Sequence, residues 1–121
     1  MELRNPTLDE LRLIDFLIKN SKEFCCPKDW KNRLKVQDME DGGMGSLFLF
    51  SEGKIRKNRI FGGQISECQF KDEDGTQVIA SLNIDKNGEL FELDVWKTNF
   101  EKLIRIPEKI RDTESQQNWN I

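Results

Sequence analysis

Residues 77–97, QVIASLNIDKNGELFELDVWK, decide the fold of this chain. Apolar and polar side chains alternate in both halves, which is the two-residue period of a β-strand. The turn sequence Asp85-Lys86-Asn87-Gly88 separates the halves, and its glycine suits a positive φ angle. The pattern therefore predicts a β-hairpin. The side chains expected to face inward are Val78, Ala80, Leu82 and Ile84 on the first strand, and Phe91, Leu93 and Val95 on the second.

Further strands precede this hairpin. A second turn of the same type, at residues 72–75, joins it to a predicted strand over residues 60–70. Within that strand, Gly62-Gly63 indicates a bulge or a close backbone approach. The alternation of apolar and polar residues at 34–37 and the short apolar run within 45–50 predict two more strands. We therefore expect a mostly antiparallel β-meander of about five strands.

A helix is expected before the strands. Thr7-Leu8-Asp9-Glu10 has the pattern of a capping box, in which the threonine hydroxyl and the glutamate carboxylate each accept from a free backbone amide. Apolar residues then recur at helical spacing and form one face. The predicted fold class is α+β, with this N-terminal amphipathic helix packed on the antiparallel meander. We expect one domain over residues 1–107 and a polar C-terminal tail over residues 108–121.

The composition of the 121 residues excludes several classes of function. The net charge of −3 disfavours nucleic-acid binding through bulk electrostatics. The absence of histidine excludes Ser-His, Cys-His and His-metal chemistry within the chain. No apolar run could span a bilayer, no secretory signal is evident, and the three cysteines lack a C-x-x-C spacing. We expect a cytoplasmic protein without a metal, a cofactor, or a nucleic-acid or membrane partner.

The polar face of the predicted sheet carries the candidate site. It presents Ser81, Asn83, Glu92, Asp94 and Trp96, joined by Gln64 and Ser66 if the register allows. Glu92 and Asp94 are two apart on one strand, so they point the same way and could act together on a ligand or on a partner's arginine. An ordinary solvated sheet face is the alternative interpretation. No apolar pocket is evident around the two carboxylates, which disfavours a glycosidase-like acid and base.

A short basic cluster separates two of the predicted strands. It consists of Lys54, Arg56, Lys57 and Arg59. These side chains could contact phosphate, but the rest of the chain supplies acids rather than further bases. We therefore interpret the cluster as a solvated connector.

Three segments carry a resemblance to known proteins. Residues 41–47 (DGGMGSL), 80–85 (ASLNID) and 88–97 (GELFELDVWK) resemble a small bacterial domain family of unknown function, and the likeness runs from Leu3 to Pro107. The strand ending ELDVWK is also similar to endings in small immunity proteins encoded beside polymorphic or contact-dependent toxins. Such proteins work by occlusion and carry no catalytic residues. The resemblance therefore implies a binding role and no catalytic site.

The leading hypothesis is a non-enzymatic protein-binding domain, an immunity protein that covers the active site of a basic cognate toxin. Trp96 would supply a desolvated anchor, and the carboxylates of Glu92 and Asp94 would steer the partner. The rival is a small-molecule binder or a carboxylate-based enzyme that uses the polar sheet face. A homodimer through an open sheet edge or through Trp96 is a third alternative.

Overall fold

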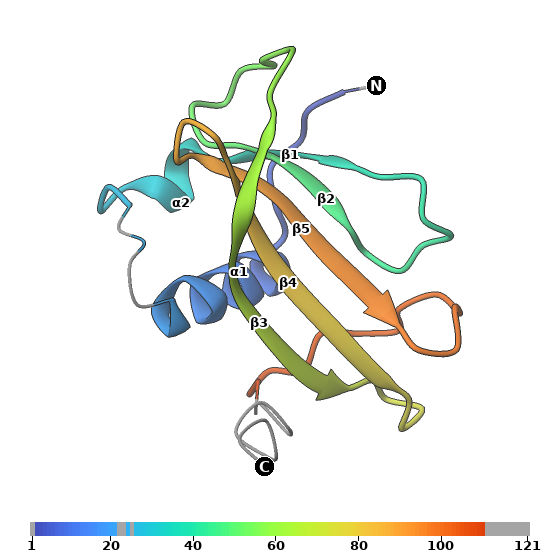
Figure 1. The fold of residues 1–121 in the computed structure, drawn as a ribbon. Helices are drawn as coiled ribbons and strands as arrows, with labels where there is room; N and C mark the ends of the chain where they lie inside the picture. Colours follow the sequence, from blue (N-terminus) through green and yellow to red (C-terminus); the bar gives the residue numbers. More distant parts are fainter. Residues whose placement is uncertain (1, 22–23, 25, 111–121) are drawn as a thin grey trace.

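The computed structural model describes residues 2–21, 24 and 26–110, and it shows one long helix packed on a five-stranded antiparallel sheet (Figure 1). The predicted α+β class is therefore confirmed. No helix among these residues is long and apolar enough to cross a membrane. In chain order the elements are α1 (Leu8–Asn20), α2 (Trp30–Arg33), β1 (Lys35–Asp38), β2 (Leu47–Phe50), β3 (Phe61–Lys71), β4 (Gln77–Asp85) and β5 (Leu90–Lys97).

The sheet joins a hairpin to a three-stranded meander. Strands β1 and β2 form the hairpin, β3 to β5 form the meander, and β5 pairs with β2, so the spatial order is β1-β2-β5-β4-β3. Residues 51–60, which we call the connector, lead from β2 to β3 at the far edge of the sheet (Figure 1). The connector passes the β4–β5 turn, where the Lys86 amide donates to the carbonyl of Ile60 at 2.9 Å.

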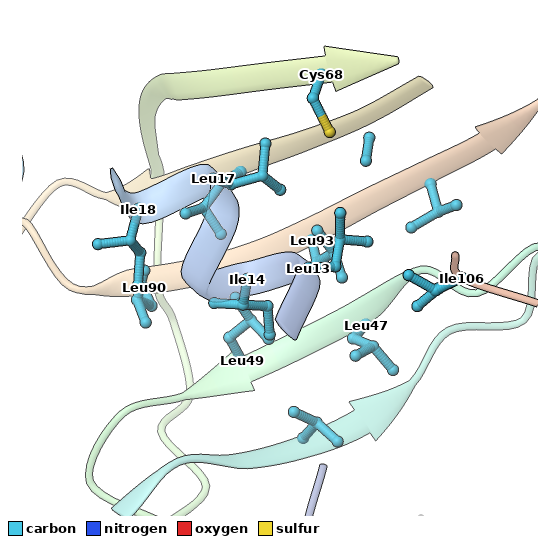
Figure 2. Packing of buried hydrophobic residues seen from close by; sticks show 14 of the residues in the cluster. Leu13, Ile14, Leu17, Ile18, Leu47, Leu49, Cys68, Leu90, Leu93 and Ile106 are labelled. Atoms are coloured by element: carbon cyan, nitrogen blue, oxygen red, sulfur yellow. The ribbon is translucent and has the colours of Figure 1, made fainter. Parts of the chain in front are cut away.

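The core lies between α1 and one face of the sheet (Figure 2). The helix begins with the predicted capping box: the Glu10 amide donates to the Thr7 hydroxyl, and the Thr7 amide donates to the Glu10 carboxylate. The apolar face of α1 then buries Leu13, Ile14, Leu17 and Ile18 against the sheet. The predicted inward side chains of Val78, Ala80, Leu82, Leu93 and Val95 are all buried there. We call this the inner face of the sheet, and the opposite side the outer face.

A β-bulge in the central hairpin overturns one predicted orientation. Asn83 lies opposite Glu92, but the next residue, Ile84, lies opposite Leu90. The residue skipped is Phe91, so Leu90 takes the inward place that the strict alternation assigned to Phe91 (Figure 2). The Phe91 ring instead lies 4.7 Å from the Arg59 guanidinium on the outer side.

Both predicted hairpin turns and the glycine approach are confirmed. Gly75 and Gly88 have φ angles of 84° and 83°, in the left-handed region that favours glycine. At Gly62 a Cβ atom would lie 2.4 Å from the carbonyl oxygen of Asp85, so only glycine fits where β3 begins. This contact holds the start of β3 against the β4–β5 turn.

Residues 98–110 extend the domain beyond the last strand. Ile106 is buried in the core, and the Arg12 guanidinium of α1 donates to the carbonyls of Ile106 and Pro107. The Leu103 amide donates to the carbonyl of Gly43 in the β1–β2 turn. The greater part of the predicted polar tail, residues 111–121, lies outside the described residues.

Candidate functional site

The outer face brings together the predicted site residues of β4 and β5. In the register of these strands Asn83 lies opposite Glu92, and Ser81 lies opposite Asp94. The Asn83 amide nitrogen donates to Asp94 Oδ2 at 2.9 Å and to Glu92 Oε1 at 3.4 Å. A single buried amide therefore holds the two carboxylates in place.

The two carboxylates differ in their surroundings. Burial raises the pKa of Glu92, and the neighbouring charge of Asp94 raises it further, whereas the Asn83 hydrogen bond and Arg59 lower it. The net effect is a raised pKa for Glu92. A cationic partner would remove part of this penalty, because an opposite charge favours the ionised carboxylate.

Of the two site residues predicted on β3, only one lies on the outer face, because of the register of that strand. Gln64 lies opposite Asn83, but a bulge follows and Ser66 lies opposite Leu82, an inward residue. The prediction for Ser66 is therefore wrong. Its place is taken by Glu67, which lies opposite Ser81 and accepts hydrogen bonds from Gln64 and Ser81, each at 3.4 Å. The sequence alone does not show where a bulge reverses the alternation.

An aromatic pair lies beside these carboxylates: Trp96, which the strand pattern predicted, and Phe100, which it did not. Trp96 is 44% exposed and Phe100 is 69% exposed, with ring centroids 6.0 Å apart. Phe100 has a φ angle of 64°, a left-handed conformation that is costly for a bulky side chain. Its amide donates to the carbonyl of Lys97 at 2.8 Å, which closes the turn that presents the ring. Strained residues cluster at functional positions, so the exposed Phe100 ring belongs to the candidate site.

Arg59 closes the end of the outer face near the β4–β5 turn, whereas the sequence predicts a solvated connector residue at this position. Its side chain is only 6% exposed, and the guanidinium lies 4.6 Å from the Phe50 ring. It donates to the carbonyl of Leu49 at 2.7 Å and to that of Leu90 at 3.1 Å. Burial lowers the pKa of Arg59. The solvated interpretation is wrong for this residue, because the bulge turns Phe91 outward and gives the guanidinium a second ring to pack on.

The other end of β5 carries a second buried cation. The Lys97 side chain is 1% exposed, and its ammonium donates to Asp72 at 2.9 Å, to Asp74 at 2.7 Å and to the carbonyl of Lys102 at 3.1 Å. Burial alone would lower the pKa of Lys97, but the bonds to both aspartates outweigh it and raise the pKa. The Lys97 bond also lowers the pKa of Asp74 to about 2. This cluster fixes the segment that carries Trp96 and Phe100.

The described pockets lie away from the carboxylates of the outer face. One is lined by residues around α2, one by the connector with the β4–β5 turn, and one by residues near Pro107; none includes Asn83, Glu92 or Asp94. Within the described part of the chain, no three His, Cys, Asp or Glu side chains come together as a metal ion would need. The acids and aromatic rings of the candidate site therefore lie outside the described pockets.

Comparison with known proteins identifies a family without an assigned activity. Residues 3–107 match the family model of a domain of unknown function, DUF6984. The matched range contains α1, α2 and all five strands. No curated protein and no solved structure matches the chain.

Proposed function

Since the chain belongs to DUF6984, a family of domains of unknown function, we propose that it is a non-enzymatic domain that binds a basic protein partner through the outer face of its sheet. One observation carries the proposal: carboxylates on the outer face of the sheet lie beside an exposed aromatic pair, and the described helix α1 packs on the opposite, inner face. Antiparallel sheets can leave one face in water, but an exposed Trp-Phe pair beside acids has the composition of a binding surface.

The charges on this face are available to a partner. Glu67, Glu92 and Asp94 form no ion pair with any described residue, and their hydrogen-bond donors are neutral amides and a hydroxyl. Unpaired carboxylates of this kind steer a basic partner, while buried aromatic anchors supply most of the binding free energy. The aromatic pair would therefore act as the anchor and the acids as the source of specificity.

The partner that we favour is a bacterial toxin whose active site the domain covers in the cytoplasm. The support is the likeness of the ELDVWK strand ending to those of immunity proteins. In the structure that ending is the part of β5 that places Glu92, Asp94 and Trp96 on the outer face. Inhibition by occlusion needs an exposed surface of this type and no reaction by the inhibitor.

Charge reversal on the outer face tests this proposal. In the variant Glu92→Lys/Asp94→Lys, affinity for the toxin encoded by the neighbouring gene should fall at least about 100-fold, because like charges facing each other across an interface cost several kcal/mol. The measurements are isothermal titration and protection of growth during co-expression. Glu2→Lys/Glu108→Lys makes the same charge change at exposed positions outside the sheet and should protect normally. Normal protection by the outer-face variant, with its fold intact by circular dichroism, would exclude this face.

A carboxylate-based enzyme or small-molecule binder is the second candidate, favoured by the raised pKa of Glu92 beside Asp94. Ligand pockets enclose most of a small ligand, whereas these two residues line none of the described pockets. The variant Glu92→Gln/Asp94→Asn separates the candidates. It would abolish a reaction that needs a carboxylate, but it would leave a protein interface with the part of its affinity that comes from Trp96.

A further inference from the structure

The pocket between the connector and the β4–β5 turn has the opposite character to the outer face. It has a volume of about 180 Å³ and is lined by residues 56–60 of the connector and residues 85–87 of the turn. Pockets for drug-sized ligands measure roughly 300–1,000 Å³, so this one suits a small group rather than a whole large molecule. We call it the connector pocket.

Cations dominate the lining of the connector pocket in a chain whose net charge is −3. Arg56, Lys57, Arg59 and Lys86 contribute four positive charges, and Asp85 contributes one negative charge. Lys86 comes from the turn, so a second segment adds a base to the basic cluster of the connector. The exposed Lys57 and Lys86 form no ion pair with any described residue. Their charges are therefore available to an anion.

The other charged groups of the pocket have partners. Arg56 pairs with Glu89 at 2.7 Å, and Arg59 donates to the two strand carbonyls described above. Asp85 accepts from the amides of Asn87 and Glu89 through Oδ1, while its buried Oδ2 lies 3.7 Å from Arg59 Nη1. The Asp85 charge is thus offset inside the protein, and it weakens the field of Lys57 and Lys86 only in part.

The backbone around the pocket is held in place by contacts with the β4–β5 turn, and some of its amide groups donate to no described residue. The Lys86–Ile60 hydrogen bond and the close approach at Gly62 hold the connector to the turn. Asn58 adopts a left-handed φ angle of 62°, and the amides of Lys57 and Asn58 donate to no described residue. A left-handed residue within a loop can gather neighbouring amides into a concavity that binds anions.

We propose that the connector pocket binds a phosphate group, with Lys57 and Lys86 as its charged ligands and the amides near Asn58 as additional donors. The exposed side chains of Ile60 and Phe61 stand beside the pocket, so the phosphate can belong either to a lipid headgroup or to a soluble phosphate ester. This site adjoins the acidic outer face at Arg59 but has the opposite sign of charge. Its ligand does not depend on the protein partner proposed above.

Titration of the full-length protein with inorganic phosphate at constant ionic strength tests the site. Nuclear magnetic resonance should show amide shifts that saturate at residues 57–60 and 86–87. Lys57→Gln/Lys86→Gln should weaken this binding at least about tenfold, because charge-assisted hydrogen bonds are about twice as strong as neutral ones. Lys57→Arg/Lys86→Arg, which keeps both charges, should retain most of it. The matched control Lys71→Gln/Lys109→Gln removes two exposed charges outside the pocket and should bind as the wild type does.

Co-sedimentation with vesicles separates the two sources of phosphate. Binding to phosphatidylglycerol vesicles but not to phosphatidylcholine vesicles, lost in Lys57→Gln/Lys86→Gln, would indicate a lipid headgroup. Saturable phosphate binding without vesicle binding would indicate a soluble ester. The proposal is overturned if phosphate shifts no amide of the pocket, or if the Lys71/Lys109 control weakens binding as much as the pocket variant does. Circular dichroism confirms that each variant is folded.

Discussion

The two hairpin turns of the meander begin with the same residue type but differ in how that residue is satisfied. Asp72 opens the β3–β4 turn and accepts hydrogen bonds from the amides of Glu73, Ile104 and Arg105 and from the Lys97 ammonium. Asp85 opens the β4–β5 turn, and its Oδ1 accepts from two turn amides while its buried Oδ2 has no hydrogen-bond partner among the described residues. We call these the closed turn and the open turn.

The difference comes from the segment that each turn receives. The closed turn receives residues 98–106, which bring backbone amides and thereby complete the coordination of a buried carboxylate. The open turn receives the connector, which brings Arg59, a cation whose donors are already committed to two strand carbonyls. Two turns that both begin with aspartate and end with glycine thus produce a fully hydrogen-bonded carboxylate in one place and a basic pocket with unpaired lysines in the other. The closed turn contributes stability, and the open turn leaves charge available for a ligand.

Replacing each of the two aspartates separately by alanine should give the largest difference in stability between the closed and the open turn. Asp72→Ala should lower the free energy of unfolding by about 3–5 kcal/mol, because it removes one of the two carboxylates that pair with the buried Lys97 ammonium and leaves three backbone amides without their acceptor. Asp85→Ala should cost less, about 2–3 kcal/mol, because it removes two turn hydrogen bonds and the carboxylate 3.7 Å from the buried Arg59 guanidinium, which keeps its bonds to two strand carbonyls. Urea unfolding followed by tryptophan fluorescence measures both. Equal losses would show that the closed and open turns do not differ in energy.

The two arginines of the connector provide a second, smaller contrast. Arg59→Met should lower the free energy of unfolding by about 2–3 kcal/mol, because the carbonyls of Leu49 and Leu90 lose their donors. Arg56→Met removes a partly exposed pair with Glu89 and should cost less than about 1 kcal/mol. The same unfolding measurement applies. If Arg59→Met were as mild as Arg56→Met, Arg59 would be a solvated connector residue, as the sequence suggested.

The fold could be predicted from sequence wherever the side-chain period was unbroken. The capping box at Thr7, the apolar face of α1 and the inward residues from Val78 to Leu82 all follow from local rules. The fold class needs only the consequence that one apolar helix face covers one apolar sheet face. These features depend on residues that are close together in the chain, so local sequence patterns are sufficient to predict them.

The outer face was harder to predict because its details depend on register. One bulge moved Ser66 inward and brought Glu67 to the surface, and another exchanged Leu90 with Phe91. A bulge shifts every later side chain by one position, and no residue pattern marks these two bulges as Gly62-Gly63 marks the irregularity at the start of β3. The burial of Arg59 followed from the same shift. The carboxylates Glu92 and Asp94 were placed correctly because they lie beyond the bulge in an alternating stretch.

The smallest expected effect concerns Phe100, a residue with a strained backbone next to Trp96 in the segment that follows β5. A glycine at this position removes the left-handed strain of about 1–2 kcal/mol but adds backbone entropy worth about 0.5–1 kcal/mol in the unfolded chain. Phe100→Gly should therefore leave the free energy of unfolding unchanged or raise it by up to about 1.5 kcal/mol, while it removes the exposed ring.

Phe100→Ala is the matched control, since it removes the same ring and keeps the strained backbone. Both variants should bind the protein partner about tenfold more weakly if the ring is an interface anchor, but only alanine should leave the strain in place. Titration calorimetry and urea unfolding together separate the two roles. Undiminished affinity in both variants would remove Phe100 from the contact surface. Equal stability of the two would instead show that no strain is stored at this position, and that the turn presents the ring without an energetic cost.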